Sequence, residues 1–207
     1  MTTTLLLARH GQTVWHAENR YAGVSDIDLT DTGRAQAEAL GRWAAARPVD
    51  AVWTSPLLRA VATAEPACRA LGLVPQREPG LRECDFGVVE GRTLAEFETE
   101  DPEWAAAYRT DPVAHSFPGA EDPRAAAARG VRALREIAAG HPGGRVLVVA
   151  HNTLLRLVLC TLLSIPLPEY RRMLPRLRNA AVSELRVRPD GTAGLMSLNV
   201  PCEEDAA

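Results

Sequence analysis

The stretch LLLARHGQT at 5–13 most constrains what this chain can fold into. Its apolar run has the length of a buried strand and ends in Arg9 and His10, so a cation and an imidazole lie at the strand's carboxyl edge. Open α/β sheets bind ligands at this edge. Gly11 lacks a Cβ and lets the backbone approach a ligand, and Thr13 supplies a hydrogen-bond donor in the turn. We therefore expect an anion to bind here.

A second strand of the same kind also ends in a histidine. Residues 145–150 form the most continuous aliphatic run after the first, and His151 follows them. A further buried strand at 50–54 leads into a helix at 56–71 that carries Arg59 in its first turn. Parallel strands joined by right-handed crossovers place their carboxyl ends at one edge of the sheet. The sequence therefore predicts that these side chains converge with the cation and imidazole of the first strand.

Such a cluster of two guanidiniums and two imidazoles favours an anionic ligand. Without a compensating acid these groups repel one another, so their convergence fits a dianion such as phosphate. The positive charge of Arg59 is unfavourable beside the positive end of the helix dipole, so another group is expected to bind its guanidinium. A metal site built on two histidines would want carboxylate ligands and no neighbouring guanidinium. We therefore expect phosphoryl chemistry with neither a metal nor a cofactor.

Length and composition indicate one domain. The chain has 207 residues, 46% of them hydrophobic, which suits a single core, with 80–120 as an insertion that forms a lid. The net charge of -3 and the pI of about 6.0 argue against nucleic acid as a partner. Four cysteines without CxxC spacing favour a reducing, cytoplasmic location, and no apolar stretch reaches the roughly 18 residues of a membrane span.

The remaining pattern predicts a doubly wound α/β fold, with a mostly parallel sheet flanked by helices. Pro66 is expected to end or kink the helix at 56–71 unless the helical pattern restarts after it. Phe97, Trp104 and Tyr108 are expected to pack within the insertion. The other expected elements are helices at 32–46, 124–139 and 153–163, a short strand at 73–76, a closing hairpin at 180–188 and 193–199, and a disordered tail at 202–207.

Four motifs in register resemble those of the histidine phosphatase superfamily, the phosphoglycerate-mutase-like enzymes. They are RHGQT at 9–13, SPLLRAVATA at 55–64, LRECDFGVVEG at 81–91 and VVAHNTLLRLVL at 148–159. The resemblance extends over nearly the whole chain. It implies the doubly wound fold and a reaction through a phosphohistidine intermediate.

The resemblance also implies a role for each core residue. His10 would be the nucleophile, Glu83 the proton donor, and Arg9, Arg59 and His151 the phosphate pocket. A neutral imidazole can attack phosphorus through Nε2 if an acceptor, such as a carbonyl of the following turn, holds Nδ1–H. The alternative for the acid is a loop carboxylate paired with a nearby arginine, either Arg82 or Arg92.

Further residues are expected to bind substrate, and some depart from the family pattern. His16 stands where the family carries an Asn that touches phosphate, so it is expected to replace that contact and to add a pH-dependent charge. Asn152 stands where a Gly often follows the second histidine. The remaining expected substrate contacts are Gly11, Thr13, Arg20, Ala22 and Gly23.

Three functions stay open at this point. The first is a metal-independent phosphomonoesterase for a small phosphorylated metabolite. The second is a phosphoglycerate mutase, which the resemblance disfavours because Cys84, Phe86 and Leu94 stand where mutases carry cationic and tyrosine side chains. The third is a non-catalytic module that binds a phosphorylated ligand, although a binder needs neither a nucleophile nor a proton donor. A homodimer through a sheet edge is also left open.

Overall fold

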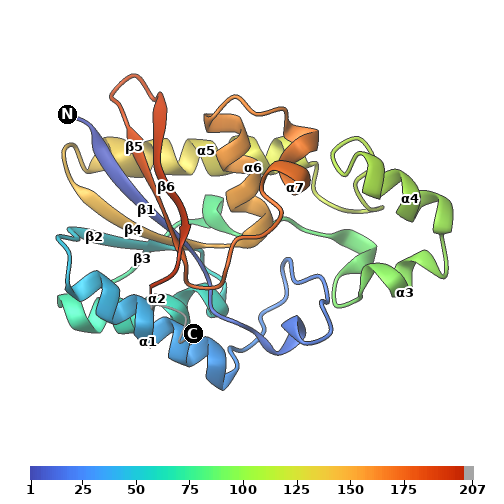
Figure 1. The fold of residues 1–207 in the computed structure, drawn as a ribbon, viewed down its shortest axis with the longest axis horizontal. Coiled ribbons are helices and arrows are strands. Elements are labelled where there is room, and N and C mark those ends of the chain that lie inside the picture. Colours follow the sequence, from blue (N-terminus) through green and yellow to red (C-terminus); the bar gives the residue numbers. More distant parts are fainter. Residues whose placement is uncertain (203–207) are drawn as a thin grey trace.

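The computed structural model describes residues 1–202 and contains a six-stranded sheet. The strands are β1 (Thr3–Arg9), β2 (Ala51–Thr54), β3 (Gln76–Arg77), β4 (Arg145–Ala150), β5 (Val182–Val187) and β6 (Ala193–Val200). They lie in the order β3-β2-β4-β1-β5-β6 (Figure 1). The first four are parallel, and β5 and β6 form an antiparallel hairpin. The predicted mostly parallel α/β sheet is confirmed.

Helices cover both faces of the sheet. They are α1 (Asp31–Ala45), α2 (Leu58–Leu71), α3 (Leu94–Glu98), α4 (Pro102–Thr110), α5 (Pro123–Gly140), α6 (Asn152–Leu162) and α7 (Tyr170–Met173). Helices α1 and α2 pack on one face of the sheet and α5 and α6 on the other, and Figure 1 shows α1 and α2 below strands β2 and β4 with α5 above them. No helix of residues 1–202 is both long and apolar enough to cross a membrane.

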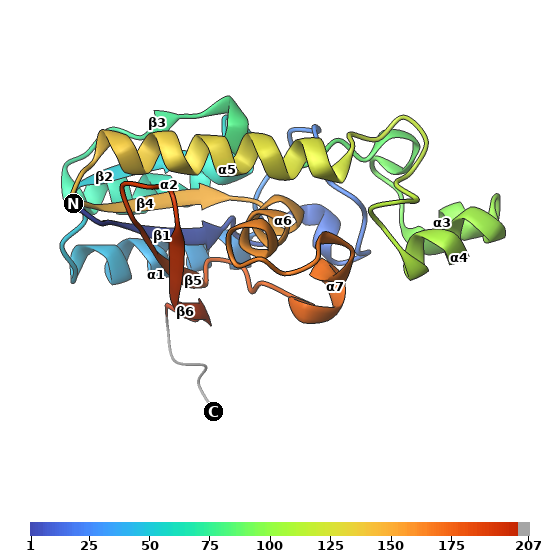
Figure 2. The same cartoon turned by 90° about the horizontal axis from the view of Figure 1, so that it is seen from above.

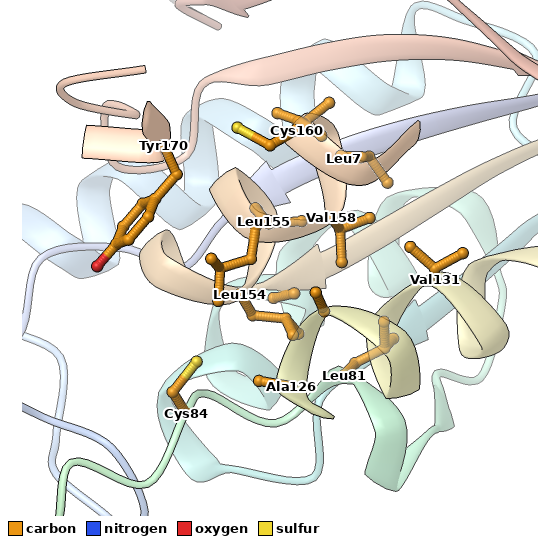
Figure 3. Close-up of a cluster of buried hydrophobic side chains, with 14 of the residues drawn as sticks. Leu7, Leu81, Cys84, Ala126, Val131, Leu154, Leu155, Val158, Cys160 and Tyr170 are labelled. Atoms are coloured by element: carbon orange, nitrogen blue, oxygen red, sulfur yellow. The ribbon is translucent and has the colours of Figure 1, made fainter. Parts of the chain in front are cut away.

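Strand β1 joins the cores on the two faces. Leu6 and Ala8 belong to the cluster beneath α1 and α2, while Leu5 and Leu7 belong to the larger cluster beneath α5 and α6. This alternation follows from the period of two along a strand. Figure 3 shows side chains of β1, α5 and α6 meeting in the larger cluster, with Leu7, Val131, Leu154 and Val158 among them.

Some local predictions were wrong. Helix α2 continues through Pro66, whose ring packs closely against Gly41 of α1, and both residues are buried. The expected strand at 73–76 is reduced to the two residues of β3. Trp104 is 38% exposed, although its indole N–H donates to the Ser116 carbonyl at 3.2 Å and Tyr108, one turn further along α4, is buried. From residue 203 onward, the expected tail lies outside the described residues.

The insertion at 80–120 adds no strand to the sheet. It holds two short helical turns followed by α3 and α4, which project beyond α6 and α7 in both views (Figures 1 and 2). Phe97 and Phe117 anchor it to the larger core cluster. The segment therefore lies beside the carboxyl end of β4, where α6 begins.

The turn after β1 packs directly against the first turn of α1. A Cβ on Gly11 would lie 2.5 Å from the carbonyl oxygen of Gly33, and a Cβ on Gly33 would lie 2.0 Å from the carbonyl oxygen of Gln12. Both contacts are to backbone, so no side chain can move aside to relieve them. The missing side chain of Gly11 therefore makes room for α1. The predicted contact of Gly11 with substrate stays a prediction.

This contact predicts that Gly33→Ala destabilises the protein even though Ala is the better helix former. Overpacking against backbone typically costs about 1–3 kcal/mol, and we expect a loss of that size in the free energy of unfolding measured with urea. Gly140→Ala, at the end of α5, is the control, because a Cβ there meets nothing within 4 Å. The control is expected to unfold at the same or slightly higher urea concentration; equal stability of the two variants would contradict the account.

Candidate active site

The two histidines that follow strands meet at the carboxyl edge of the sheet. Strands β1 and β4 are neighbours, with Arg9 paired to Ala150, and the His10 N–H donates to the Ala150 carbonyl at 3.0 Å. The ring centroids of His10 and His151 lie 5.2 Å apart. Both residues are buried, His10 at 4% exposure and His151 at 0%. The convergence predicted from the strand ends is confirmed.

The His10 ring has the orientation that a nucleophile requires. Its Nδ1 lies 2.7 Å from the carbonyl oxygen of Gly11, so the N–H is assigned to Nδ1 and the lone pair to Nε2. Burial lowers the pKa of His10 well below its usual value, and the charges of Arg9 and Arg59 lower it further. At neutral pH the imidazole is therefore uncharged.

His151 is the least satisfied polar group of the site. Neither ring nitrogen makes a hydrogen bond to any residue in the range 1–202. Burial lowers its pKa well below the usual value, and the charges of Arg59 and His10 act in the same direction. A buried imidazole without partners is costly, and a ligand oxygen near it would supply the missing bond.

Arg59 is fully buried at the start of α2, and backbone carbonyls hold it. Its guanidinium donates to the carbonyls of Ser25 at 2.7 Å, Gly23 at 2.8 Å and Ala22 at 3.0 Å. The sequence predicted that some group must bind Arg59 at the N-terminus of its helix. These three carbonyls, from the loop after β1, are that group. Burial lowers the pKa of Arg59, but a guanidinium remains charged at neutral pH.

Arg9 is held between the C-terminal segment and His16. It donates to the carbonyl of Leu177 at 2.8 Å, and its second terminal nitrogen lies 2.5 Å from His16 Nε2. The backbone N–H of Thr13 donates to Nδ1 of His16 at 3.0 Å, and Thr13 Oγ1 lies 2.8 Å from the same nitrogen. Burial and Arg9 lower the pKa of His16 to about 4, so its expected pH-dependent charge is absent near neutrality.

Glu83 lies at the start of α6 and is buried. Its carboxylate accepts N–H bonds from Thr153 and Leu154 in the first turn of that helix, and from Cys84, each at 2.9 Å. The positive end of a helix favours an acidic group in this position. The alternative pairing with Arg82 or Arg92 is not found. Oε2 accepts one of these bonds, which leaves it room for a proton.

Arg129 of α5 fixes the backbone that carries Glu83. It donates to the carbonyls of Gly80, Arg82 and Glu83 at 2.9, 2.7 and 3.0 Å. Its charge is compensated by Glu121, whose carboxylate lies 2.7 Å from Nε. Sequence reasoning missed this contact because it joins two segments that no motif spacing relates.

A pocket of about 150 Å³ opens in front of His10. Its lining includes seven residues predicted to act on or bind substrate: Arg9, His10, His16, Arg20, Ala22, Glu83 and Asn152. It also includes residues not predicted to bind substrate: Asn19, Tyr21, Phe86, Tyr108, Thr153, Arg156, Tyr170 and Arg171. Arg156 could have been predicted as a pocket residue from the sequence, because it is the one cation in the otherwise apolar helix TLLRLVLCTLL.

Three other predicted substrate contacts have hydrogen-bond partners within the protein. Thr13 is buried against His16, and the N–H of Gly11 donates to Thr63 Oγ1 at 2.9 Å. Neither lines the pocket. Gly23 does not line it either, and its N–H donates to the Glu90 carboxylate.

Arg20 does reach the pocket, but its charge is already compensated. Its guanidinium lies 2.6 Å from Glu18 and 3.1 Å from Glu96. No group of three or more His, Cys, Asp and Glu side chains suited to a metal ion occurs within residues 1–202.

Comparison with known proteins places this geometry in a family. The model of the histidine phosphatase superfamily (branch 1) matches residues 5–200. A probable phosphoglycerate mutase, GpmB of Cronobacter sakazakii, is 34% identical over 179 residues, which cover 86% of this chain and 82% of the relative.

Two solved structures share the fold. YhfR of Bacillus stearothermophilus superposes with a TM-score of 0.90 at 29% identity, covering 97% of this chain and 100% of that one. A mycobacterial glucosyl-3-phosphoglycerate phosphatase superposes with a TM-score of 0.87 at 27% identity, with the same coverage of both chains. These likenesses support an enzyme with phosphatase activity. The chain belongs to the histidine phosphatase superfamily.

Proposed function

We propose that the protein is a metal-independent phosphomonoesterase that hydrolyses a small phosphorylated metabolite through a phosphohistidine on His10. The observation that carries the proposal is the 2.7 Å contact between Nδ1 of His10 and the Gly11 carbonyl, which leaves the lone pair on Nε2. The charges of Arg9 and Arg59 help to keep this imidazole neutral, because they lower the pKa of His10. Burial of the thiols of Cys68, Cys84 and Cys160 outside any disulfide supports a reducing, cytoplasmic setting.

In the first step Nε2 of His10 attacks the phosphorus of the bound ester. The N–P bond forms as the bond from phosphorus to the ester oxygen breaks, and Glu83 gives a proton to the leaving oxygen. Arg9 and Arg59 balance the charge spread over the phosphoryl oxygens. Binding of a dianion raises the pKa of His151, so the ring takes up a proton from solvent and donates a hydrogen bond to one of these oxygens.

In the second step water cleaves the phosphohistidine. Glu83, now a carboxylate, takes a proton from the water as the water oxygen bonds to phosphorus. The N–P bond breaks, the electron pair returns to Nε2, and inorganic phosphate leaves. The three N–H bonds to Glu83 keep the carboxylate in place through both steps, and Arg129 holds the backbone beneath it.

A mutase is the second candidate, because the relative from Cronobacter sakazakii carries that name. A mutase must return the phosphoryl group to its substrate and exclude water. The segment after Glu83 presents Phe86 to the pocket and buries Cys84, so it offers no cation there. This observation favours hydrolysis.

The nucleophile is tested by His10→Ala. We expect kcat/KM for p-nitrophenyl phosphate to fall by at least about 10³-fold, because the variant cannot form the covalent intermediate. Release of inorganic phosphate by the wild type is expected to continue in EDTA. His115→Ala, at an exposed position outside the site, is the matched control and should retain activity. A folded, fully active His10→Ala protein would refute the proposal, as would isomerisation of 3-phosphoglycerate without phosphate release.

The proton donor is tested by Glu83→Gln, using two esters that differ in their leaving group. An alkoxide needs protonation and a nitrophenolate does not, so we expect a loss of about 10²-fold or more for glycerol 3-phosphate and a much smaller loss for p-nitrophenyl phosphate. The measurement is kcat/KM for each ester. Equal losses would remove Glu83 from this role.

A further inference from the structure

Two arginines of the pocket take no part in the proposed reaction. Arg156 of α6 and Arg171 of α7 both line it. Neither forms an ion pair with a carboxylate of residues 1–202, whereas Arg20 in the same lining pairs with Glu18 and Glu96. Glu83 is the only carboxylate of the lining, and backbone N–H groups already occupy it.

Arg156 is the more buried of the two, with 6% exposure. Its protein contacts are long: 3.3 Å to the carbonyls of Leu174 and Asn152 and 3.2 Å to that of Pro175. Its guanidinium carbon lies 4.9 Å from the ring centroid of Tyr170. Long bonds to neutral carbonyls compensate a desolvated cation poorly, so an anion in the pocket would stabilise it.

Arg171 lies at the rim, and the aromatic wall of the pocket orients it. Its NH1 donates to the Tyr108 hydroxyl at 2.7 Å, and its guanidinium carbon lies 5.2 Å from the ring centroid of Tyr108. Tyr108 is buried and receives a further bond from the Tyr21 hydroxyl at 3.3 Å. The long side chain of Arg171 is therefore already fixed, which reduces the entropy lost when it binds a ligand.

These two cations come from a different part of the fold than the groups that act on phosphorus. Arg9 ends β1, His10 follows it, and Arg59 comes from α2, whereas Arg156 and Arg171 come from α6 and α7. One pocket of about 150 Å³ is lined by Arg9 and His10 as well as by Arg156 and Arg171. A short substrate in this pocket can therefore contact both pairs of residues.

We propose that the substrate carries a second anionic group, a carboxylate or a second phosphate, which Arg156 and Arg171 bind while its phosphate faces His10. This inference rests on the proposed phosphatase function and narrows its substrate class. Guanidinium forks bind both kinds of oxyanion, so the shared chemistry is a second oxyanion a few bonds from the ester.

Three esters with the same three-carbon skeleton test the proposal. Glycerol 3-phosphate has a neutral far end, 3-phosphoglycerate has a carboxylate there, and glycerol 1,3-bisphosphate has a second phosphate. We expect kcat/KM for phosphate release to be at least about tenfold higher for one of the two acidic esters, as charge-assisted bonds give. The preferred ester identifies the oxyanion. Equal values for all three would overturn the proposal.

Variants locate the preference on the two arginines. In Arg171→Gln and Arg156→Met, the ratio of kcat/KM between the acidic and neutral esters should fall at least about fivefold. Arg172→Gln is the matched control from the same helix, because its side chain is 75% exposed and pairs with Glu169. The control should keep the wild-type ratio. An unchanged ratio in both folded test variants would contradict the proposal.

One outcome separates this inference from the function on which it rests. If the wild-type protein releases no phosphate from p-nitrophenyl phosphate or from any of the three esters, the phosphatase function itself is wrong. If it hydrolyses p-nitrophenyl phosphate and treats the three esters alike, only the second anionic group is wrong.

Discussion

The site depends on burying positive charge where two parallel strands end. Arg59 is fully buried, and burial lowers the pKa of Arg9 to about 10. Backbone carbonyls offset part of the free-energy cost of burying these guanidiniums, because they supply partial negative charge without a second full charge. The same cations, together with burial, keep the imidazoles of His10 and His151 neutral. The folded protein therefore presents a positively charged cup whose reactive nitrogen is unprotonated.

The scaffold explains why these groups hold their positions. The register of β1 on β4 sets the separation of the two histidines, and the bare backbones of Gly11 and Gly33 allow α1 to brace the turn that carries His10. Helix α6 performs two tasks, since its first turn fixes Glu83 and its second turn presents Arg156 to the same pocket. Each functional group is thus tied to a strand end or a helix terminus.

Sequence reasoning reached the parts of the site that regular structure dictates. Aliphatic runs ending in His10 and His151 predicted their meeting, because parallel strands end at one edge. Long-range contacts between irregular segments left no such signal: nothing in the sequence pairs Arg129 with the loop at 80–83, or seats Arg171 on the tyrosine wall. A bare turn such as Gly11 is equally suited to a ligand and to a helix, so the sequence did not indicate that α1 packs on it. Helix α2 runs through Pro66, whose ring packs against Gly41 of α1, a contact that the local sequence of α2 does not reveal.

In the free protein the imidazoles of His10 and His151 are neutral, and a bound dianion brings a proton to His151. NMR of the histidine ring nitrogens measures this directly, with His10 and His151 assigned through variants. We expect that neither ring takes up a proton between pH 8 and pH 6 in the free protein, because both pKa values lie well below 6.5. On addition of inorganic phosphate at pH 6, His151 should gain a proton. Titration of both rings near pH 6.5 in the free protein, or no change at His151 when phosphate binds, would contradict the account.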